Sequence, residues 1–176
     1  MDKATIIIAI IFVILIILLF VVTIVFKNSK KKSILSTIDK LTTEKNQIIS
    51  ASLITELSKA NKLVNNNKKT EKDVLEWKKR FEIIETVDLP KLTDKLIDIE
   101  TLCLDEEYAE AYKKLIDIEK NIFHVKAKSV KLLGEIKELT ESEDRNREAL
   151  TKLKSKYREI VFKYNKNKND YQETST

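Results

Sequence analysis

Residues 108–139 read YAEAYKKLIDIEKNIFHVKAKSVKLLGEIKEL, and this stretch decides the fold class. Its apolar residues recur at alternating steps of three and four, the spacing of one face of an α-helix. The pattern resumes further along and holds over about nine heptads, which is typical of a coiled coil. Gly134 costs such a helix about 1 kcal/mol relative to alanine and does not end it. We therefore expect one long helix that ends near Tyr171, with this stripe: Tyr108, Ala111, Leu115, Ile118, Ile122, Val125, Ser129, Leu132, Ile136, Leu139, Leu150, Leu153, Tyr157, Ile160 and Tyr164.

Two shorter helical stretches precede the long one. The first covers residues 33–64, and the Asn65–Asn67 triplet after it predicts a loop, because asparagine competes for backbone hydrogen bonds and tolerates left-handed conformations. The second covers 70–102, with Thr70 as its expected N-cap. Pro90 predicts a kink near 87–89, since proline removes a helical hydrogen bond. A short connection at 103–105 leads to the long helix. The two expected stripes are Ile34, Ile38, Leu41, Ile49, Leu53, Leu57, Ala60 and Val64, and then Val74, Trp77, Phe81, Ile84, Leu92, Leu96, Ile99 and Leu102.

The composition supports an all-α fold. The 176 residues include one glycine, one proline and one cysteine, whereas average usage gives roughly a dozen glycines. Sheet proteins need glycine and proline to turn their strands, so an all-β or α/β fold is excluded. Phosphate-binding loops and Cys/His metal sites are disfavoured for the same lack of residues, and we expect no cofactor and no metal. The single cysteine, Cys103, cannot form an intrachain disulfide.

Residues 4–26 read ATIIIAIIFVILIILLFVVTIVF and carry no charge. As a helix this segment measures about 35 Å, enough to cross a hydrocarbon core of about 30 Å. A cleaved signal peptide has a shorter apolar region and a small-residue cleavage site, so a permanent transmembrane helix fits better. Four lysines follow the segment: Lys27, Lys30, Lys31 and Lys32. They place residues 1–3 outside the cell membrane and the chain from Lys27 onward in the cytoplasm. The reducing cytoplasm agrees with an unpaired Cys103.

The helix lengths predict an antiparallel three-helix bundle over 33–139, with a long third helix protruding beyond it. We expect its core to include Trp77, Phe81, Ile84, Leu115, Ile118 and Ile122, with Trp77 near Ile118. Residues 140–171 then form a helical extension without partners, and 172–176 a disordered tail. The exposed seam of the extension is Leu150, Leu153, Tyr157, Ile160 and Tyr164. It is explained by a homodimer through 140–171, or by further helices of a longer protein; the shared helices of spectrin-like repeats favour the second.

Four local stretches carry a resemblance to a known family. They are SLITELSK at 52–59, EWKKRFEII at 76–84, LPKL at 89–92 with Leu96, and LTESEDRNRE at 139–148 followed by Tyr157. In this order behind a membrane span, they resemble the EzrA family of septation ring formation regulators. The resemblance covers nearly the whole chain but only the N-terminal part of a family member: the membrane anchor and the first spectrin-like repeat.

The resemblance implies a scaffold and not an enzyme. Family members are membrane-anchored cytoplasmic proteins that bind FtsZ, the tubulin-like ring protein, and couple the ring to other division proteins. The chain is then expected at the cell membrane and enriched at the division site. Two rivals share the long charged helices: the b-type peripheral stalk of a rotary ATP synthase, and a generic membrane-tethered coiled-coil adaptor. The Asn65–Asn67 loop and Pro90 argue against the stalk, whose helices run almost unbroken.

The remaining chemistry-bearing residues have structural explanations. His124 has no second histidine or cysteine to share a metal ion. Cys103 lacks a resolving cysteine and is expected to pack as a small hydrophobe. The basic stretch 152–168 could contact nucleic acid, but Tyr157 and Tyr164 occupy the heptad stripe, so helix packing is the better interpretation. The lipid bilayer and division proteins are therefore the expected partners.

Overall fold

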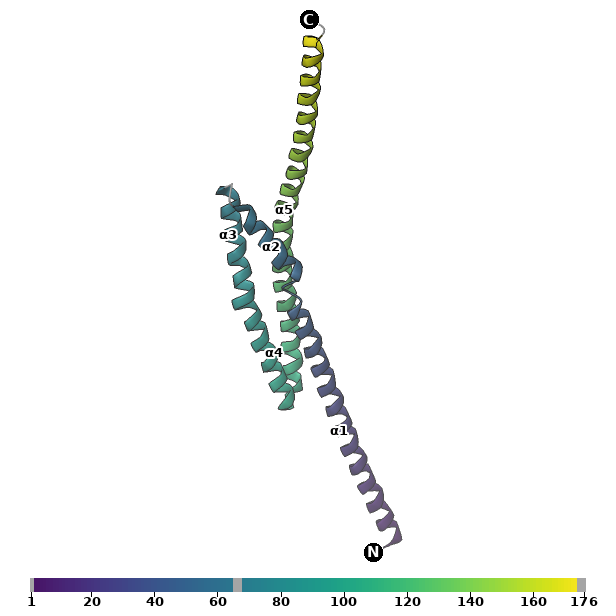
Figure 1. Ribbon diagram of the computed structural model, residues 1–176. Helices are drawn as coiled ribbons and strands as arrows, with labels where there is room; N and C mark the ends of the chain where they lie inside the picture. Colours follow the sequence, from purple (N-terminus) through teal and green to yellow (C-terminus); the bar gives the residue numbers. More distant parts are fainter. Residues whose placement is uncertain (1, 65–67, 174–176) are drawn as a thin grey trace. The chain divides into compact units, whose positions relative to one another are not determined.

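The computed structural model describes residues 2–64 and 68–173, and these form helices and turns without a strand. The elements are α1 (Lys3–Asn46), α2 (Ala51–Leu63), α3 (Lys68–Ile83), the π-helical turn η2 (Ile84–Asp88), α4 (Leu89–Leu104) and α5 (Tyr108–Glu173). Figure 1 shows them along the chain. The predicted all-α class is confirmed. The Asn65–Asn67 loop and residues 174–176 of the expected tail lie outside the described residues, whereas 172–173 continue α5 as helix.

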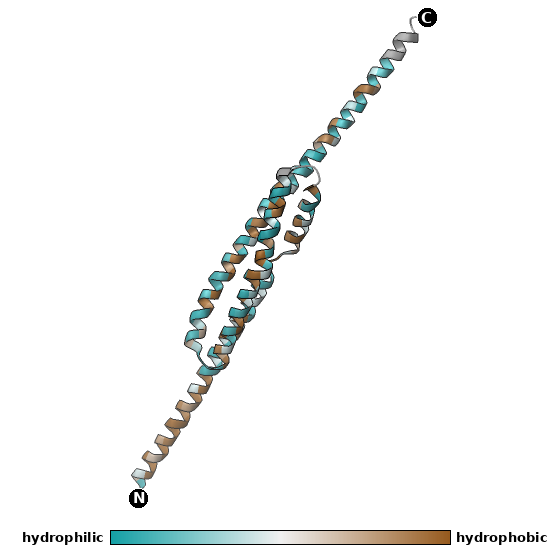
Figure 2. Ribbon diagram, turned by 90° about the vertical axis from the view of Figure 1, so that its left-hand side faces the viewer, coloured by the Kyte–Doolittle hydropathy of each residue, from teal (hydrophilic) through white to brown (hydrophobic). Residues whose placement is uncertain are grey.

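Helix α1 joins the apolar segment to the polar chain without a break. It runs for 44 residues, and the side chains of 4–26 are all exposed. Figure 2 shows this part of α1 as mostly hydrophobic (brown). Among the described residues, it is the one helix long and apolar enough to cross a membrane. The basic segment 27–32 is therefore part of the same helix, and no separate linker lies between the apolar segment and the buried residues Ile34 and Ile38.

The first predicted stretch, 33–64, is broken at 47–50, which corrects the expectation of one continuous helix. Gln47 closes α1: its N–H lies 3.2 Å from the carbonyl oxygens of both Thr43 and Glu44. The turn buries Ile48, which is 3% exposed, while Ile49 is only half-buried. The predicted stripe placed Ile49 in this position. The buried position is therefore Ile48 and not Ile49, because the residues of the turn no longer follow the helical period of α1.

The chain divides into two compact units. In unit 1 (residues 1–50 and 79–130), α1, α4 and the first part of α5 pack together. Lys45 donates to Thr93 at 2.8 Å and Cys103 lies against the backbone of Lys31, so α4 runs antiparallel to α1. Its core is made by the buried side chains of Ile34, Ile38, Leu41, Ile48, Ile84, Leu92, Leu96, Ile99, Cys103, Ala111, Leu115, Ile118, Ile122 and Val125.

Unit 2 contains residues 51–78 and 131–176. Hydrogen bonds join its three helical segments: Lys78 donates to Asn61 at 2.6 Å, and Thr140 of α5 donates to Glu56 at 2.7 Å. The core is smaller, with Leu53, Ala60, Val74, Trp77, Leu132 and Ile136 buried. Thr70 is also buried, at 5% exposed, and lies inside α3, which begins at Lys68. The expectation that Thr70 caps this helix is therefore wrong.

The α-helix is interrupted just before Pro90, beside the position where a kink was predicted. The backbone passes from α3 through five π-helical residues, Ile84–Asp88, and Pro90 stands in the first turn of α4. The N–H of Leu89 donates to the carbonyl of Ile84, five residues earlier. Proline fits at this point because it lacks a backbone N–H, and the N–H groups in the first turn of a helix have no carbonyl acceptor within that helix.

Candidate functional site

The four lysines that follow the apolar segment all lie on α1. The ammonium of Lys27 pairs with the carboxylate of Glu106, and this hydrogen bond raises the pKa of Lys27. The Nζ atom of Lys30 lies 5.4 Å from the centre of the Phe26 ring. The turn between α4 and α5 thus meets α1 where its apolar segment ends. If 4–26 cross a bilayer, this turn lies at the membrane surface.

The turn itself is a Schellman motif, the common hydrogen-bonded end of a helix. Glu107 donates to the carbonyl of Leu102 at 2.9 Å, and Glu106 donates to the carbonyl of Cys103 at 3.4 Å. Glu106 takes φ 63°, a position usually given to glycine. The connection spans 105–107, and not 103–105 as expected, because Cys103 and Leu104 complete the last turn of α4. No glycine marks this helix end, so the sequence offers no local signal for it.

Cys103 is buried against α1 and is 0% exposed. Its Sγ lies 3.8 Å from the carbonyl oxygen of Lys31. Burial raises the pKa of the thiol, with the neighbouring Lys31 acting in the opposite direction. A covered thiol that is kept protonated reacts slowly.

The predicted core residues fall in both units. Trp77 is buried in unit 2, where its indole N–H donates to Glu135 at 3.2 Å. Unit 1 holds Ile84, Leu115, Ile118 and Ile122, all buried, and also Phe81, which is half-buried.

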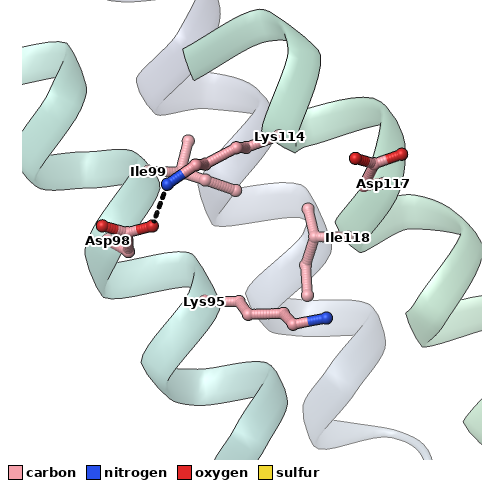
Figure 3. A pocket seen from close by; sticks show the side chains of 6 residues that line it. All are labelled: Lys95, Asp98, Ile99, Lys114, Asp117 and Ile118. Atoms are coloured by element: carbon pink, nitrogen blue, oxygen red, sulfur yellow. Dashed lines mark hydrogen bonds and ion pairs between the residues drawn. The ribbon is translucent and has the colours of Figure 1, made fainter. Parts of the chain in front are cut away.

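The expected neighbourhood of Trp77 and Ile118 is wrong. Ile118 lies beside Lys95 and Ile99 of α4 in a surface depression (Figure 3). Glu135, the partner of Trp77, is about 25 Å further along α5. A stripe that repeats every three or four residues defines a face, but it does not define which turns of two helices lie opposite each other.

Charged side chains bridge the groove between α4 and α5. Lys114 donates to Asp98 at 2.5 Å, and Lys128 donates to Asp88 at 3.0 Å. Figure 3 shows Lys114 reaching across to Asp98. Both pairs agree with an antiparallel arrangement of 88–98 and 114–128. His124 lines the same groove with its side chain exposed, and the described residues contain no group of three His, Cys, Asp or Glu side chains that could hold a metal ion.

Unit 2 contains one cluster of polar side chains at the end of its core. Glu56, whose side chain is 13% exposed, accepts hydrogen bonds from Lys59 at 2.7 Å and from Thr140 at 2.7 Å. The bond from Lys59, followed by that from Thr140, lowers the pKa of Glu56, and burial opposes this effect. Thr140 is itself 4% exposed, so the packed part of α5 includes this residue, the first of the predicted extension.

The predicted partner seam is exposed along its whole length. Leu150, Leu153, Tyr157, Ile160 and Tyr164 are between 57% and 69% exposed. Lys154, Lys156 and Arg158 line the same shallow depression as the first four of them. All side chains from 144 to 167 are exposed. This surface is apolar along its middle and basic at its edges.

A second exposed stripe on α5 was missed by the sequence reasoning. Tyr112, Ile116, Phe123 and Val130 are all exposed, Phe123 by 74%. The last three stand seven residues apart, so the heptad spacing was visible in the sequence. It went unnoticed because the core stripe occupies neighbouring positions with the same period.

Comparisons with known proteins agree on one family. The family described as "Septation ring formation regulator, EzrA" matches residues 6–176. A septation ring formation regulator EzrA of Geobacillus sp. (strain WCH70) is 30% identical over 135 residues, which are 77% of this chain and 24% of that protein. Its counterpart in Bacillus licheniformis is 27% identical over 131 residues, which are 74% of this chain and 23% of that protein.

The chain spans about a quarter of the length of the curated relatives that it matches. No solved structure matches the chain significantly. The family match extends from the apolar part of α1 to the end of the sequence and so includes every surface described above. The chain belongs to the EzrA family of septation ring formation regulators.

Proposed function

We propose that this chain is a membrane-anchored cytoplasmic scaffold that acts on the bacterial septation ring by binding and spacing, without catalysis. The observation that carries the proposal is the family match over 6–176, which includes the apolar segment and the packed helices together. Residues 4–26 cross the membrane with the N-terminus outside, and 27–32 lie at the cytoplasmic surface. The helices from 33 to 139 form a spectrin-like repeat, and 140–171 extend from it. FtsZ and other division proteins are the proposed partners.

The unbroken helix α1 supports a spacing role. A flexible linker after a membrane span lets a domain sample many positions, whereas a continuous helix transmits the direction of the span to the packed helices. Helix α1 runs from Lys3 to Asn46, and Ile34, Ile38 and Leu41 bury it in unit 1. A membrane tether also raises the effective concentration of weak binding surfaces near the bilayer. Rigid attachment then sets the distance at which those surfaces act.

A peripheral stalk is disfavoured by the hydrogen bonds that fold the chain back. A stalk helix runs almost unbroken, whereas here α4 lies antiparallel to α1 through Lys45 and Thr93, and antiparallel to α5 through Asp98 and Lys114. A generic adaptor differs from a ring regulator only in its partner. The family match favours the ring regulator.

The test combines localisation with binding. A fluorescent fusion of the full chain is expressed in a rod-shaped bacterium of the same genus as one of the relatives, such as Bacillus. It is expected to concentrate at midcell. Residues 27–176 are expected to sediment together with FtsZ polymers. A matched variant without 4–26 should keep the co-sedimentation and lose the midcell signal. Diffuse envelope fluorescence together with no co-sedimentation would contradict the proposal.

A further inference from the structure

The outer stripe of α5, defined as Tyr112, Ile116, Phe123 and Val130, is a row of exposed apolar side chains on unit 1. Their exposed fractions are 38%, 57%, 74% and 62%. Ile116, Phe123 and Val130 are separated by seven residues, or two helical turns, and Tyr112 lies one turn before Ile116, so all four share one face. The line is about 27 Å long. Single exposed apolar residues are normal on a protein surface, but three in heptad register with a fourth one turn before them are a pattern that needs an explanation.

The outer stripe is separate from the core of unit 1. The core positions Leu115 and Ile122 are 5% and 1% exposed, and each stands one residue before a member of the stripe. One residue turns an α-helix by about 100°, so the stripe faces solvent while its neighbours face α1 and α4. Ala127 stands on the same side between Phe123 and Val130 and is also exposed. A small residue there leaves room for a second helix to approach closely.

The charges beside the stripe are mostly positive. Lys113, Lys120 and Lys126 flank it, with Glu119 as the one acidic neighbour, and all four side chains are exposed. The described residues give these three lysines no ion pair. The lysines that face α4 differ: Lys114 and Lys128 are paired with Asp98 and Asp88. The unpaired lysines therefore border the surface that is apolar and uncovered.

We propose that the outer stripe docks an acidic amphipathic helix of another protein. A partner with an apolar heptad seam and Glu or Asp at its edges would cover the stripe and pair with Lys113, Lys120 and Lys126. A second copy of this chain would instead bring lysines against lysines, which is unfavourable. An anionic bilayer would meet only one column of apolar residues, and membrane-surface helices present a broader apolar face. The inference goes beyond the proposed function, which assigns no partner-binding residues.

The probe is a synthetic helix of three heptads with Leu and Ile at its seam and Glu at its edges, and a matched peptide carries Lys at the edges. Both are titrated by fluorescence anisotropy against the full chain in phosphatidylcholine nanodiscs. The acidic peptide is expected to bind, and the basic peptide to bind at least about tenfold more weakly. Phe123→Ser and, as a second variant, Ile116→Ser should each weaken binding of the acidic peptide by about tenfold. Both side chains are exposed, so helicity by circular dichroism should not change.

Two controls locate the binding. Tyr157→Ser, on the other exposed seam of α5, should leave the affinity unchanged. The triple change Lys113→Glu, Lys120→Glu and Lys126→Glu should reverse the preference, so that the basic peptide binds better. The proposal is overturned if the acidic peptide does not bind or if Phe123→Ser has no effect. It is also overturned if Tyr157→Ser abolishes binding of the acidic peptide. The same holds if Phe123→Ser weakens only the self-association of the chain, or only its binding to phosphatidylglycerol vesicles.

Discussion

The hydroxyl of Ser129 donates a hydrogen bond to the carbonyl oxygen of Ile48 at a distance of 2.5 Å, inside unit 1. The two residues are 4% and 3% exposed. Ile48 stands just after α1 ends, where carbonyls lose their helical partners. A serine in the apolar stripe of α5 thereby supplies a hydrogen-bond donor to a backbone carbonyl in the turn between α1 and α2. This bond explains how the chain can interrupt a helix in a buried place.

Ser129→Ala should therefore destabilise the protein by about 1–3 kcal/mol, because the buried carbonyl of Ile48 loses its donor. Urea unfolding of residues 27–176, followed by circular dichroism, measures the change. Ser155→Ala on the exposed part of α5 is the matched control and should change the free energy of unfolding by less than about 0.5 kcal/mol. Equal effects of the two substitutions would show that the bond to Ile48 contributes nothing.

Glu56 makes stability depend on pH. Its pKa is lowered in the folded state by the hydrogen bonds from Lys59 and Thr140. The stabilisation is therefore complete above the pKa of an unfolded glutamate and is lost as the pH falls through the lowered value. Glu56→Gln should cost about 1 kcal/mol at pH 7 and reduce the loss of stability below about pH 4.

Urea titrations of residues 27–176 at several pH values measure this effect. The control is Glu138→Gln, because Glu138 is exposed on α5. Because this side chain faces water, the substitution should change the free energy of unfolding by less than about 0.5 kcal/mol. If Glu56→Gln and Glu138→Gln give the same curve, the polar cluster around Glu56 does not act as described.

Glu106 is held in a backbone conformation that favours glycine. Its φ of 63° costs about 1 kcal/mol for a residue with a Cβ atom. Glu106→Gly should raise the free energy of unfolding, since the lost ion pair with Lys27 is exposed to water and screened. Glu106→Ala removes the same carboxylate but keeps the strain, so it should be less stable than the glycine variant. Thermal unfolding of both variants isolates the backbone effect, and an alanine variant as stable as the glycine variant would contradict it.

Gly134 lies inside α5 with open space around it. A Cβ atom built at this position would meet nothing within 4 Å. Gly134→Ala should stabilise the helix by about 1 kcal/mol, because alanine loses less backbone entropy on folding. Ala127→Gly, at an exposed position of the same helix, should destabilise it by a similar amount. Calorimetric melting temperatures that move in these opposite directions would confirm the effect, and a decrease for Gly134→Ala would contradict it.

The sequence predicts the helices better than it predicts how they meet. The alternation of apolar residues defined α5, and Pro90 marked the π-helical turn, because both signals are local. The break at 47–50 was missed although the first stripe skips from Leu41 to Ile49, with polar residues at 42–47 between them. The buried bond between Ser129 and Ile48, which joins residues 81 positions apart, stabilises this break. A long-range bond of this kind leaves no mark in a local pattern.

The candidate site could be predicted only in part. The basic residues after the apolar segment and the exposed seam at 150–164 follow from composition and spacing. The pairing of Trp77 with Glu135, and that of Lys27 with Glu106, depends on helix register. Sequences with a heptad period permit several helix registers that bury similar apolar residues. Ion pairs such as Lys114 with Asp98 distinguish these registers only once the helices have packed. The left-handed Glu106 had no sequence signal, since a glycine is usual at that position.

The most direct test of the account is whether the chain folds back on its membrane-anchored helix in native membranes. Lys45→Cys and Thr93→Cys, in a Cys103→Ala background, should be joined within one chain by a short bismaleimide, because the two native side chains are 2.8 Å apart. The control pair Lys27→Cys and Thr93→Cys should not be cross-linked to each other, since Lys27 is about 27 Å from Lys45 along α1. Cross-linking confined to separate chains, or equal yields for the two pairs, would contradict the folded-back structure on which the proposed scaffold depends.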